Sequence, residues 1–128
     1  MTSARPVVLD SSAVLALLQE EPGADEVEGV LDGALMSCVN LSEVLQKAEQ
    51  HGVDTEGLEY DLEALGIELR DFDVPAARPA ADLWSDRNEL SLGDRACLAL
   101  AKSTDATAIT ADGRWVTAGT DVDVRMIR

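Results

Sequence analysis

Short apolar runs alternate along this chain with longer segments in which apolar residues recur every three or four positions. Short runs bounded by turn-forming residues predict buried strands, and the three-to-four spacing predicts amphipathic helices. The runs place strands at 7–9, 34–39, 67–70, 106–110 and 122–127. The spaced segments place helices at 11–20, 24–32, 40–50, 54–65, 75–88, 91–102 and 112–118.

Several of the predicted helix ends carry specific signals. Ser11 or Ser12 can cap the first helix, and Asn40 and Ser91 stand where later helices begin. Gly52 follows the third helix, and glycine at that position commonly ends a helix. A proline, at position 79, falls near the first turn of the fifth helix, so a slight irregularity is expected there.

The alternation of strands and helices determines the expected fold class. Strands joined by helical crossovers form a mostly parallel sheet with helices on both faces, and the crossovers should be right-handed. We therefore expect a three-layer α/β/α fold with about five strands. No internal repeat, low-complexity segment or linker interrupts the chain, so residues 1–128 are interpreted as a single domain.

The composition favours a soluble protein in a reducing compartment. Hydrophobic residues make up 46% and charged residues 27% of the chain, and no apolar run approaches the roughly 18 residues that a membrane span needs. The first residues lack the apolar segment of a secretory signal peptide. Cys38 and Cys97 stand apart, without the spacing of a disulfide framework. We therefore expect a cytoplasmic protein with two ordinary buried thiols.

The net charge of −15 argues against nucleic acid until its distribution is considered. Residues 20–73 hold 16 acids and two bases, whereas residues 74–128 hold eight acids and seven bases. The acidic part is most simply a solvated helical surface. Because the C-terminal part is nearly balanced, an anionic substrate can approach that side.

Four acidic residues fall near the ends of predicted strands or at the beginning of predicted helices. Asp10 follows the first strand, Glu43 lies one turn into the helix after the second, and Asp112 follows the fourth. Asp94 lies in the first turn of a helix that is otherwise almost wholly apolar. Ligands of open α/β sheets bind beyond the carboxyl ends of the strands, so these acids are candidates for one site.

Each of the four acids also has a structural explanation as a helix-capping group. The candidate caps and capping pairs are Asp10, Asp112, Asn40 with Glu43, and Ser91 with Asp94. However, serine, threonine and asparagine residues beside the acids can perform the same capping. Four converging carboxylates would repel one another unless a cation neutralised them or one of them held a proton. Since Mg²⁺ prefers oxygen ligands, the set predicts a magnesium site.

Other chemistries find little support in the sequence. His51 is the only histidine and lies at a helix end, which disfavours a zinc site and a Ser-His-Asp triad. The chain contains no GxSxG, GxxxxGK[ST] or GxGxxG motif. Cys97 lies among apolar residues of a helix, which is typical of a core position rather than a nucleophile.

Four short motifs follow one another along the chain, each with one acid: VVLDSSAVLALL, NLSEVLQK, LSLGDRACLALA and TADGRW. In this order they resemble the motifs of PIN-domain ribonucleases, and most closely those of the VapC toxins of bacterial toxin–antitoxin pairs. The resemblance covers essentially the whole chain. It implies a Mg²⁺- or Mn²⁺-dependent endoribonuclease with a sheet ordered 3-2-1-4-5. It also implies a homodimer that a small cognate antitoxin, similar to VapB, inhibits.

The resemblance also implies roles for individual residues. The implied catalytic acids are Asp10, Glu43, Asp94 and Asp112. Asp10 and Asp94 match the firmest metal contacts of such proteins, and Asp112 is the next metal ligand. Ser11 and Thr110 match positions that line the site of the family.

The fourth motif departs from the family pattern in two respects. Gly113 stands where many members have a bulky or charged residue, and Trp115 stands in a stretch where some carry a further acid, so a fifth ligand is in doubt. Arg95 and Arg114 lie one or two residues from a site acid. They either contact phosphates that flank the cleaved bond or compensate the charge of the acids.

The implied reaction is hydrolysis of an RNA phosphodiester bond. One or two cations would orient and polarise the phosphate, and Glu43 or another acid of the set would deprotonate the attacking water. Since aromatic residues make up 3% of the chain, selection of an accessible single-stranded loop by shape is favoured over stacking on individual bases.

Two alternatives stay open at this point. The first is a receiver domain, a non-catalytic Mg²⁺-binding signalling module of similar length. A receiver needs paired acids after the first strand and a lysine after the last parallel strand, whereas here the first acid is single and the last strand reads VDVRMIR. The second is a PIN nuclease that acts on DNA or in RNA processing, or a catalytically idle PIN scaffold.

Overall fold

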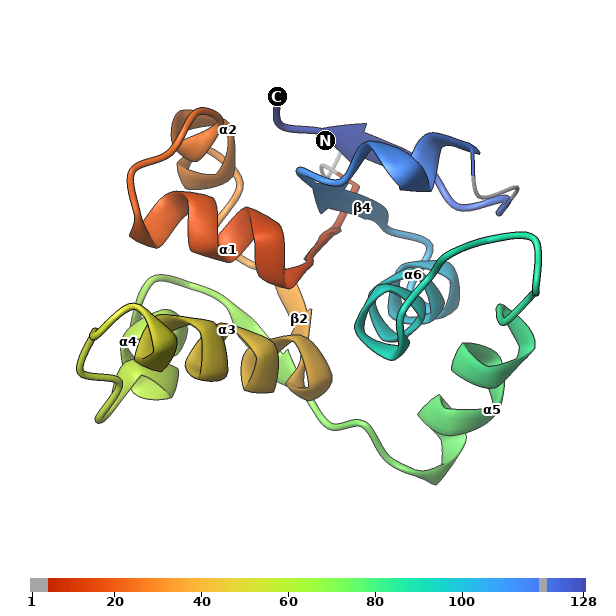
Figure 1. The fold of residues 1–128 in the computed structure, drawn as a ribbon, viewed down its shortest axis with the longest axis horizontal. Coiled ribbons are helices and arrows are strands. Elements are labelled where there is room, and N and C mark those ends of the chain that lie inside the picture. Colours follow the sequence, from red (N-terminus) through yellow and green to blue (C-terminus); the bar gives the residue numbers. More distant parts are fainter. Residues whose placement is uncertain (1–4, 118–119) are drawn as a thin grey trace.

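A five-stranded sheet forms the centre of the computed structural model, which describes residues 5–117 and 120–128 (Figure 1). Neighbouring strands run parallel throughout, in the order β3-β2-β1-β4-β5. The strands are β1 (Val7–Leu9), β2 (Leu35–Ser37), β3 (Glu68–Arg70), β4 (Thr107–Thr110) and β5 (Val124–Met126). The predicted fold class, strand number and strand order are therefore confirmed, with a sheet that is parallel rather than mostly parallel.

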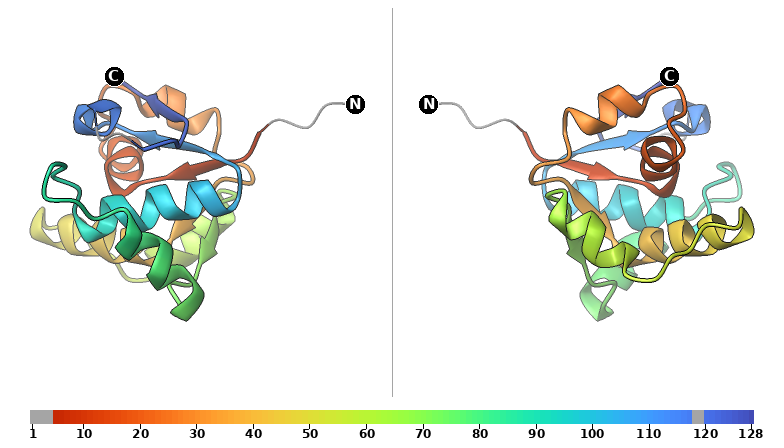
Figure 2. Two further views of the ribbon diagram at one scale, coloured as in Figure 1. Left: turned by 90° about the vertical axis from the view of Figure 1, so that its right-hand side faces the viewer. Right: turned by 90° about the vertical axis from the view of Figure 1, so that its left-hand side faces the viewer.

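Helices cover both faces of the sheet (Figures 1 and 2). The helices in the described part of the chain are α1 (Ser11–Leu18), α2 (Ala24–Glu28), α3 (Cys38–Gln50), α4 (Leu58–Ala64), α5 (Val74–Asp82), α6 (Leu92–Ser103) and the 3₁₀-helix η1 (Gly113–Thr117). Side chains from α1 to α4 join the core on one face, and side chains from α6 and η1 join it on the other. This arrangement confirms the three layers.

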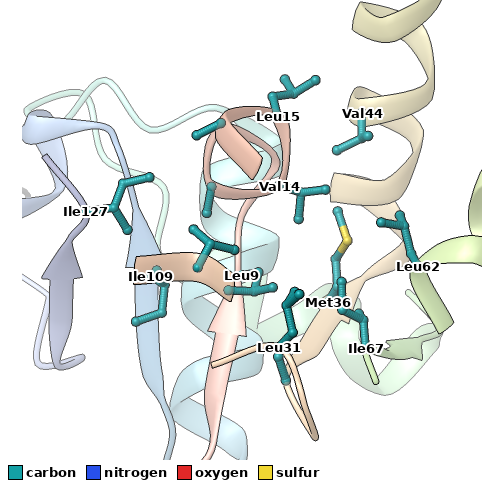
Figure 3. Close-up of a cluster of buried hydrophobic side chains, with 14 residues drawn as sticks. Leu9, Val14, Leu15, Leu31, Met36, Val44, Leu62, Ile67, Ile109 and Ile127 are labelled. Carbon is teal, nitrogen blue, oxygen red and sulfur yellow. The ribbon is translucent and has the colours of Figure 1, made fainter. Parts of the chain in front are cut away.

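Alternate residues of the central strand β1 point into the two core layers. Leu9 packs with Met36 on the face covered by α1 to α4 (Figure 3). Val8 packs with Leu98 of α6 on the opposite face. Val8 and Leu9 are fully buried, so β1 is held from both sides. The next residue, Asp10, is thereby fixed at the carboxyl edge of the sheet.

Two helices begin at residues other than those predicted. Helix α3 begins two residues before Asn40, because the Ser37 hydroxyl accepts a hydrogen bond from the Val39 N–H at 3.2 Å and caps the helix there. Helix α4 begins after Gly57 rather than near residue 54. Gly57 has φ of 77°, a left-handed conformation that an α-helix cannot include.

Helix α5 ends earlier than predicted, at the beginning of a polar stretch. The Asn88 side chain donates to the Leu83 carbonyl oxygen, and the Ser85 hydroxyl accepts from the Arg87 N–H, so residues 83–88 form a turn instead. Pro79 lies inside α5. The second helix, the second strand and the last strand are also shorter than predicted. The predicted helix at 112–118 is the 3₁₀-helix η1, and residue 118 lies outside the described residues.

Both cysteines are free thiols, and Cys97 is buried in α6 as predicted, whereas Cys38 is half-buried. The helices of residues 5–117 and 120–128 include none with the length and apolar character that crossing a membrane requires.

Candidate active site

Asp10 ends the central strand and caps the first helix. Its Oδ1 accepts a hydrogen bond from the Ala13 N–H at 2.9 Å, as expected of an N-cap residue. The residue is 4% exposed. Burial raises the pKa of Asp10 from 3.8 to about 6, although hydrogen bonds from Thr110, Ala13 and Ser12 oppose the rise. The protein therefore holds this carboxylate where its negative charge is poorly solvated.

Two hydroxyl groups hold the Asp10 carboxylate in place. Ser12 Oγ lies 2.8 and 2.9 Å from its two oxygens, and Thr110 Oγ1 donates to Oδ2 at 2.6 Å. The same hydroxyls accept hydrogen bonds of 2.9 Å from the backbone N–H groups of Ala111 and Asp112. They therefore connect the carboxyl ends of β1 and β4 through one carboxylate.

Sequence reasoning named Ser11 and Thr110 beside the site and missed Ser12. Thr110 does contact Asp10, but the serine hydroxyl that reaches the carboxylate is that of Ser12. A signal for Ser12 was present in the sequence. If Asp10 is the N-cap, its carboxylate lies over the first turn of the helix, and Ser12 belongs to that turn.

Glu43 lies in α3 with its carboxylate against the first turn of α6. Asn40 Nδ2 donates to Glu43 Oε1 at 2.9 Å. A Cβ atom at Gly93 would lie 2.4 and 2.5 Å from the two oxygens of that carboxylate. The approach of α3 to α6 at this point therefore depends on a residue without a side chain. Asn40 was predicted as a helix cap, and the structure instead uses it as a partner of Glu43.

Asp94 forms the capping box that the sequence predicts. The Ser91 N–H donates to Asp94 Oδ2 at 2.9 Å, and Ser91 Oγ accepts from the Asp94 N–H at 3.1 Å. The charge of Asp94 also acts on Asp10, whose pKa it raises. Asp94 is therefore both a structural cap and an electrostatic neighbour of the buried carboxylate.

The charges of three of the four predicted acids act on the Cys97 thiol. Burial raises its pKa, and the charges of Asp10, Asp94 and Glu43 raise it further. The three carboxylates therefore act electrostatically on one buried thiol of α6. A thiol in such surroundings stays protonated near neutral pH, as expected of a core residue rather than a nucleophile.

Asp112 follows β4 as predicted, and its carboxylate is paired with Arg114. Arg114 Nε lies 3.0 and 3.1 Å from the two carboxylate oxygens, and Nη2 also donates to Oδ2. These hydrogen bonds lower the pKa of Asp112, outweighing its partial burial. Hydrogen bonding to Asp112 raises the pKa of Arg114, and the charge of Asp94 adds to this effect. The pair therefore lies within electrostatic reach of Asp94.

Arg95 follows Asp94 in the chain but contacts the end of α5. Its Nη1 donates to the Ala80 carbonyl oxygen at 3.1 Å. Its Nε is buried and has no hydrogen-bond partner among the described residues. This contact between α5 and α6 belongs to neither role considered from the sequence. The phosphate contact of Arg95 stays a prediction.

The carboxylate oxygens of the predicted acids are donors of the kind that suits a hard divalent cation. The charged group that raises the pKa of Asp10 is another carboxylate, that of Asp94. A cation near Asp10 would therefore stabilise the buried negative charge of Asp10. In the part of the chain that the structure describes, no three His, Cys, Asp or Glu side chains are grouped closely enough to hold a metal ion. Asp94 and Asp112 instead bond to Ser91 and Arg114. Metal ligation by Asp10, Asp94 and Asp112 stays a prediction.

A protein-family model described as the PIN domain matches residues 7–119 of the chain. The matched range begins at β1 and includes all four predicted acids. A comparison with curated protein sequences found no match.

Several solved structures resemble the chain over nearly its whole length. A toxin–antitoxin complex from Klebsiella pneumoniae is similar with a TM-score of 0.75 and 18% identity, covering 95% of this chain and 98% of that chain. DNA-bound VapBC from Salmonella typhimurium is similar with a TM-score of 0.73 and 14% identity, covering 98% and 100%. FitAcB from Neisseria gonorrhoeae is similar with a TM-score of 0.69 and 24% identity, covering 94% and 97%. At these identities the likeness is one of fold.

Proposed function

The chain belongs to the PIN domain family, and from that premise we propose that it is a divalent-metal-dependent endoribonuclease, the toxin of a toxin–antitoxin pair. The observation that carries the proposal is the buried Asp10 carboxylate at the carboxyl end of β1, with a pKa raised to about 6 and a second acid acting on it. A carboxylate whose ionisation is disfavoured by its surroundings is typical of functional sites.

Mg²⁺, or Mn²⁺ in its place, is the expected cofactor. We expect Asp10 and Asp94 to hold it, with Asp112 as the next ligand, because oxygen donors are the ligands that these ions prefer. When bound, the cation supplies the positive charge that polarises the scissile phosphate and favours ionisation of the attacking water. Ser12 and Thr110 support this role, because they fix the Asp10 carboxylate in one orientation before a ligand arrives.

Glu43 is the residue that we assign to proton transfer. Its half-buried carboxylate is held by Asn40 against the first turn of α6, the helix that carries Asp94, which supports a role in accepting the proton of the attacking water. Another acid of the set is the alternative base. Arg114, whose side chain is 57% exposed, is placed to contact a phosphate next to the cleaved bond while it compensates the charge of Asp112.

We propose an antitoxin as the protein partner. One of the similar solved structures is a toxin–antitoxin complex from Klebsiella pneumoniae, and another is DNA-bound VapBC from Salmonella typhimurium. A small VapB-like antitoxin would bind this chain and inhibit cleavage. A homodimer, a cytoplasmic location and a substrate with an accessible single-stranded RNA loop complete the proposal.

The proposal is tested with purified protein, end-labelled RNA hairpins and DNA hairpins of the same sequence, each in Mg²⁺ or in EDTA. We expect RNA cleavage in Mg²⁺ alone, its loss in Asp10→Asn, and its retention in Asp25→Asn, which changes an exposed acid of α2. Cleavage in EDTA, or an Asp10→Asn variant as active as the wild type, would refute the assignment. Cleavage of DNA but not RNA would identify a DNA nuclease instead.

The receiver-domain alternative is disfavoured by the strand order. Receiver domains share the flavodoxin-like order 2-1-3-4-5, whereas the order here is 3-2-1-4-5. We therefore expect the intact mass of the protein to stay unchanged after incubation with a small phosphodonor and Mg²⁺. A gain of one phosphoryl group would favour the receiver.

A further inference from the structure

Asn40 is a buried polar residue whose presence helix capping does not explain. It is 1% exposed and lies in the first turn of α3, where Ser37 already caps the helix. Asparagine inside a helix is less favourable than most residues, because its side chain competes for backbone hydrogen bonds. Its presence at this position therefore has another physical reason.

The Asn40 amide connects α3 to α6. Its Nδ2 donates to Glu43 Oε1 at 2.9 Å and to the Gly93 carbonyl oxygen at 3.0 Å. Both partners are acceptors, which determines the orientation of the amide. Its Oδ1 is then buried with no hydrogen-bond partner among the described residues. A buried, unpaired oxygen destabilises a fold, so an apolar residue here would avoid that cost.

Gly93, in α6, is a second residue that is unfavourable for its own helix and that lies against the Glu43 carboxylate. Glycine within a helix is less stable than alanine, yet Gly93 is buried in the first turn of α6. A Cβ atom there would lie 2.4 to 2.6 Å from the carboxylate atoms of Glu43. The Glu43 carboxylate therefore occupies the space that a side chain at position 93 would take. Asn40 and Gly93 are 53 positions apart, and each is unfavourable in its own helix. Asn40 donates to the Glu43 carboxylate, and Gly93 leaves room for it.

We propose that Asn40 is a positioning residue that, together with Gly93, holds the Glu43 carboxylate in one orientation for RNA cleavage. The inference rests on the proposed function, because it takes Glu43 as the group that accepts the proton. A neutral amide orients a carboxylate without the countercharge that lysine or arginine would bring.

Two variants release the carboxylate by different means. Asn40→Leu removes the donor while keeping most of the volume, and Gly93→Ala places a methyl group where the carboxylate now lies. We expect each variant to lower kcat by about 100-fold with little change in KM, because displacement of a catalytic group acts on the chemical step. The midpoint of thermal unfolding should stay within about 4 °C of the wild type. If Asn40→Leu does not fold, Gly93→Ala decides the matter.

The matched control is Gly29→Ala at the end of α2. A Cβ atom at Gly29 would lie 3.6 and 3.7 Å from the nearest atoms, which is ordinary contact. This variant should keep the kcat of the wild type. Wild-type kcat in both Asn40→Leu and Gly93→Ala would overturn the inference.

A positioning role also predicts how the substitutions combine. In a Glu43→Ala background there is no carboxylate to orient, so neither Asn40→Leu nor Gly93→Ala should lower kcat further. A residue that acts independently of Glu43, or through general loss of structure, would instead lower kcat by the same factor in both backgrounds. That result would refute the proposed role of Asn40.

A measurement without RNA or metal separates this inference from the proposed function. In EDTA, the side-chain amide protons of Asn40 should exchange slowly with D₂O in NMR spectra, and their resonances should shift in Glu43→Ala. Fast exchange, with resonances that Glu43→Ala leaves in place, would overturn the inference even in an active enzyme. Absence of RNA cleavage by the wild type would refute the proposed function, while the amide resonances still decide whether Asn40 holds Glu43.

Discussion

Replacing Asp10 by asparagine should stabilise the metal-free protein, and the gain should grow as the pH rises. The pKa of Asp10 is about 6 in the folded protein, against 3.8 as its ordinary value. Between these two values the folded state binds more protons than the unfolded state, so stability falls as the pH rises. The stability that protonated Asp10 contributes to the folded state is fully present below pH 3.8 and is lost as the pH rises through about 6.

The pKa shift sets the size of the effect. A rise of about 2 pKa units corresponds to roughly 3 kcal/mol, at 1.36 kcal/mol per unit. Solvent screens little of this effect, because Asp10 is buried. An asparagine at position 10 can still accept from the Ala13 N–H, and the hydroxyls of Ser12 and Thr110 can rotate to accept from its amide. The side chain would thus keep its hydrogen bonds and lose only the ionisation.

The assay is urea unfolding in EDTA at several pH values between 4 and 8. The difference in unfolding free energy between Asp10→Asn and the wild type should increase by about 3 kcal/mol over this range, mostly between pH 4 and 7. Asp112→Asn is the control. Arg114 lowers the pKa of Asp112, so the stability that Asp112 contributes is present above its ordinary pKa and lost only as the pH falls below that value.

The wild type should therefore differ from Asp112→Asn by a constant amount between pH 5 and 8. A difference between Asp10→Asn and the wild type that is equally independent of pH would refute the reasoning. Saturating Mg²⁺ should stabilise the wild type more than Asp10→Asn, because an ion that binds the folded state shifts the unfolding equilibrium.

Three further substitutions have direct readouts. Thr110→Val removes the 2.6 Å donor to Asp10, so an NMR titration should place the pKa of Asp10 above that of the wild type, and an unchanged or lower pKa would contradict the geometry. Leu9→Ala, in the fully buried layer beneath α1, should lower the free energy of urea unfolding by about 2–5 kcal/mol, and a loss below about 1 kcal/mol would count against this packing. Arg95→Met removes the bond to the Ala80 carbonyl oxygen, so the amides of α5 should exchange faster with D₂O, and unchanged protection would show that the bond does not hold this helix.

The fold class was predictable because its signals are local, whereas the strand order came from the resemblance to PIN-domain ribonucleases. Each strand is a short apolar run and each helix has its own spacing, so the order of the elements follows from neighbouring residues. Boundaries were less predictable where two residues compete for one role. Ser37 and Asn40 are both residue types that cap helices. The cap of α3 is Ser37, whose hydroxyl accepts from the Val39 N–H, so the helix begins before Asn40. Gly57 adopts a left-handed conformation before α4. Glycine permits this conformation but also adopts others, so the sequence alone did not predict that α4 begins after it.

The site was predictable in its acids but less so in their partners. The positions of Asp10 and Asp112 after buried strands follow from topology alone. The partners depend on contacts that no local pattern contains. From the sequence, Asn40 is a candidate helix cap. In the structure its amide donates to the Gly93 carbonyl oxygen, a partner 53 residues away that local patterns cannot indicate. From the sequence, Arg95 is a candidate partner of the acids or of a phosphate. In the structure α5 packs against α6, and Arg95 donates to the Ala80 carbonyl oxygen of α5.

Asp10 differs from other acidic residues at the ends of the strands in the groups that surround it. At the amino edge, Asp105 and Asp123 are exposed and both pair with Arg5. At the carboxyl edge, Asp112 pairs with Arg114, whereas Asp10 is buried among hydroxyl and amide donors and has Asp94 as its charged neighbour. Hydrogen bonds from neutral donors orient a carboxylate but leave its charge in place, whereas an arginine would cancel it. Burial of the Asp10 charge beside Asp94 therefore lowers stability near neutral pH, as expected where a fold departs from local rules at a functional site.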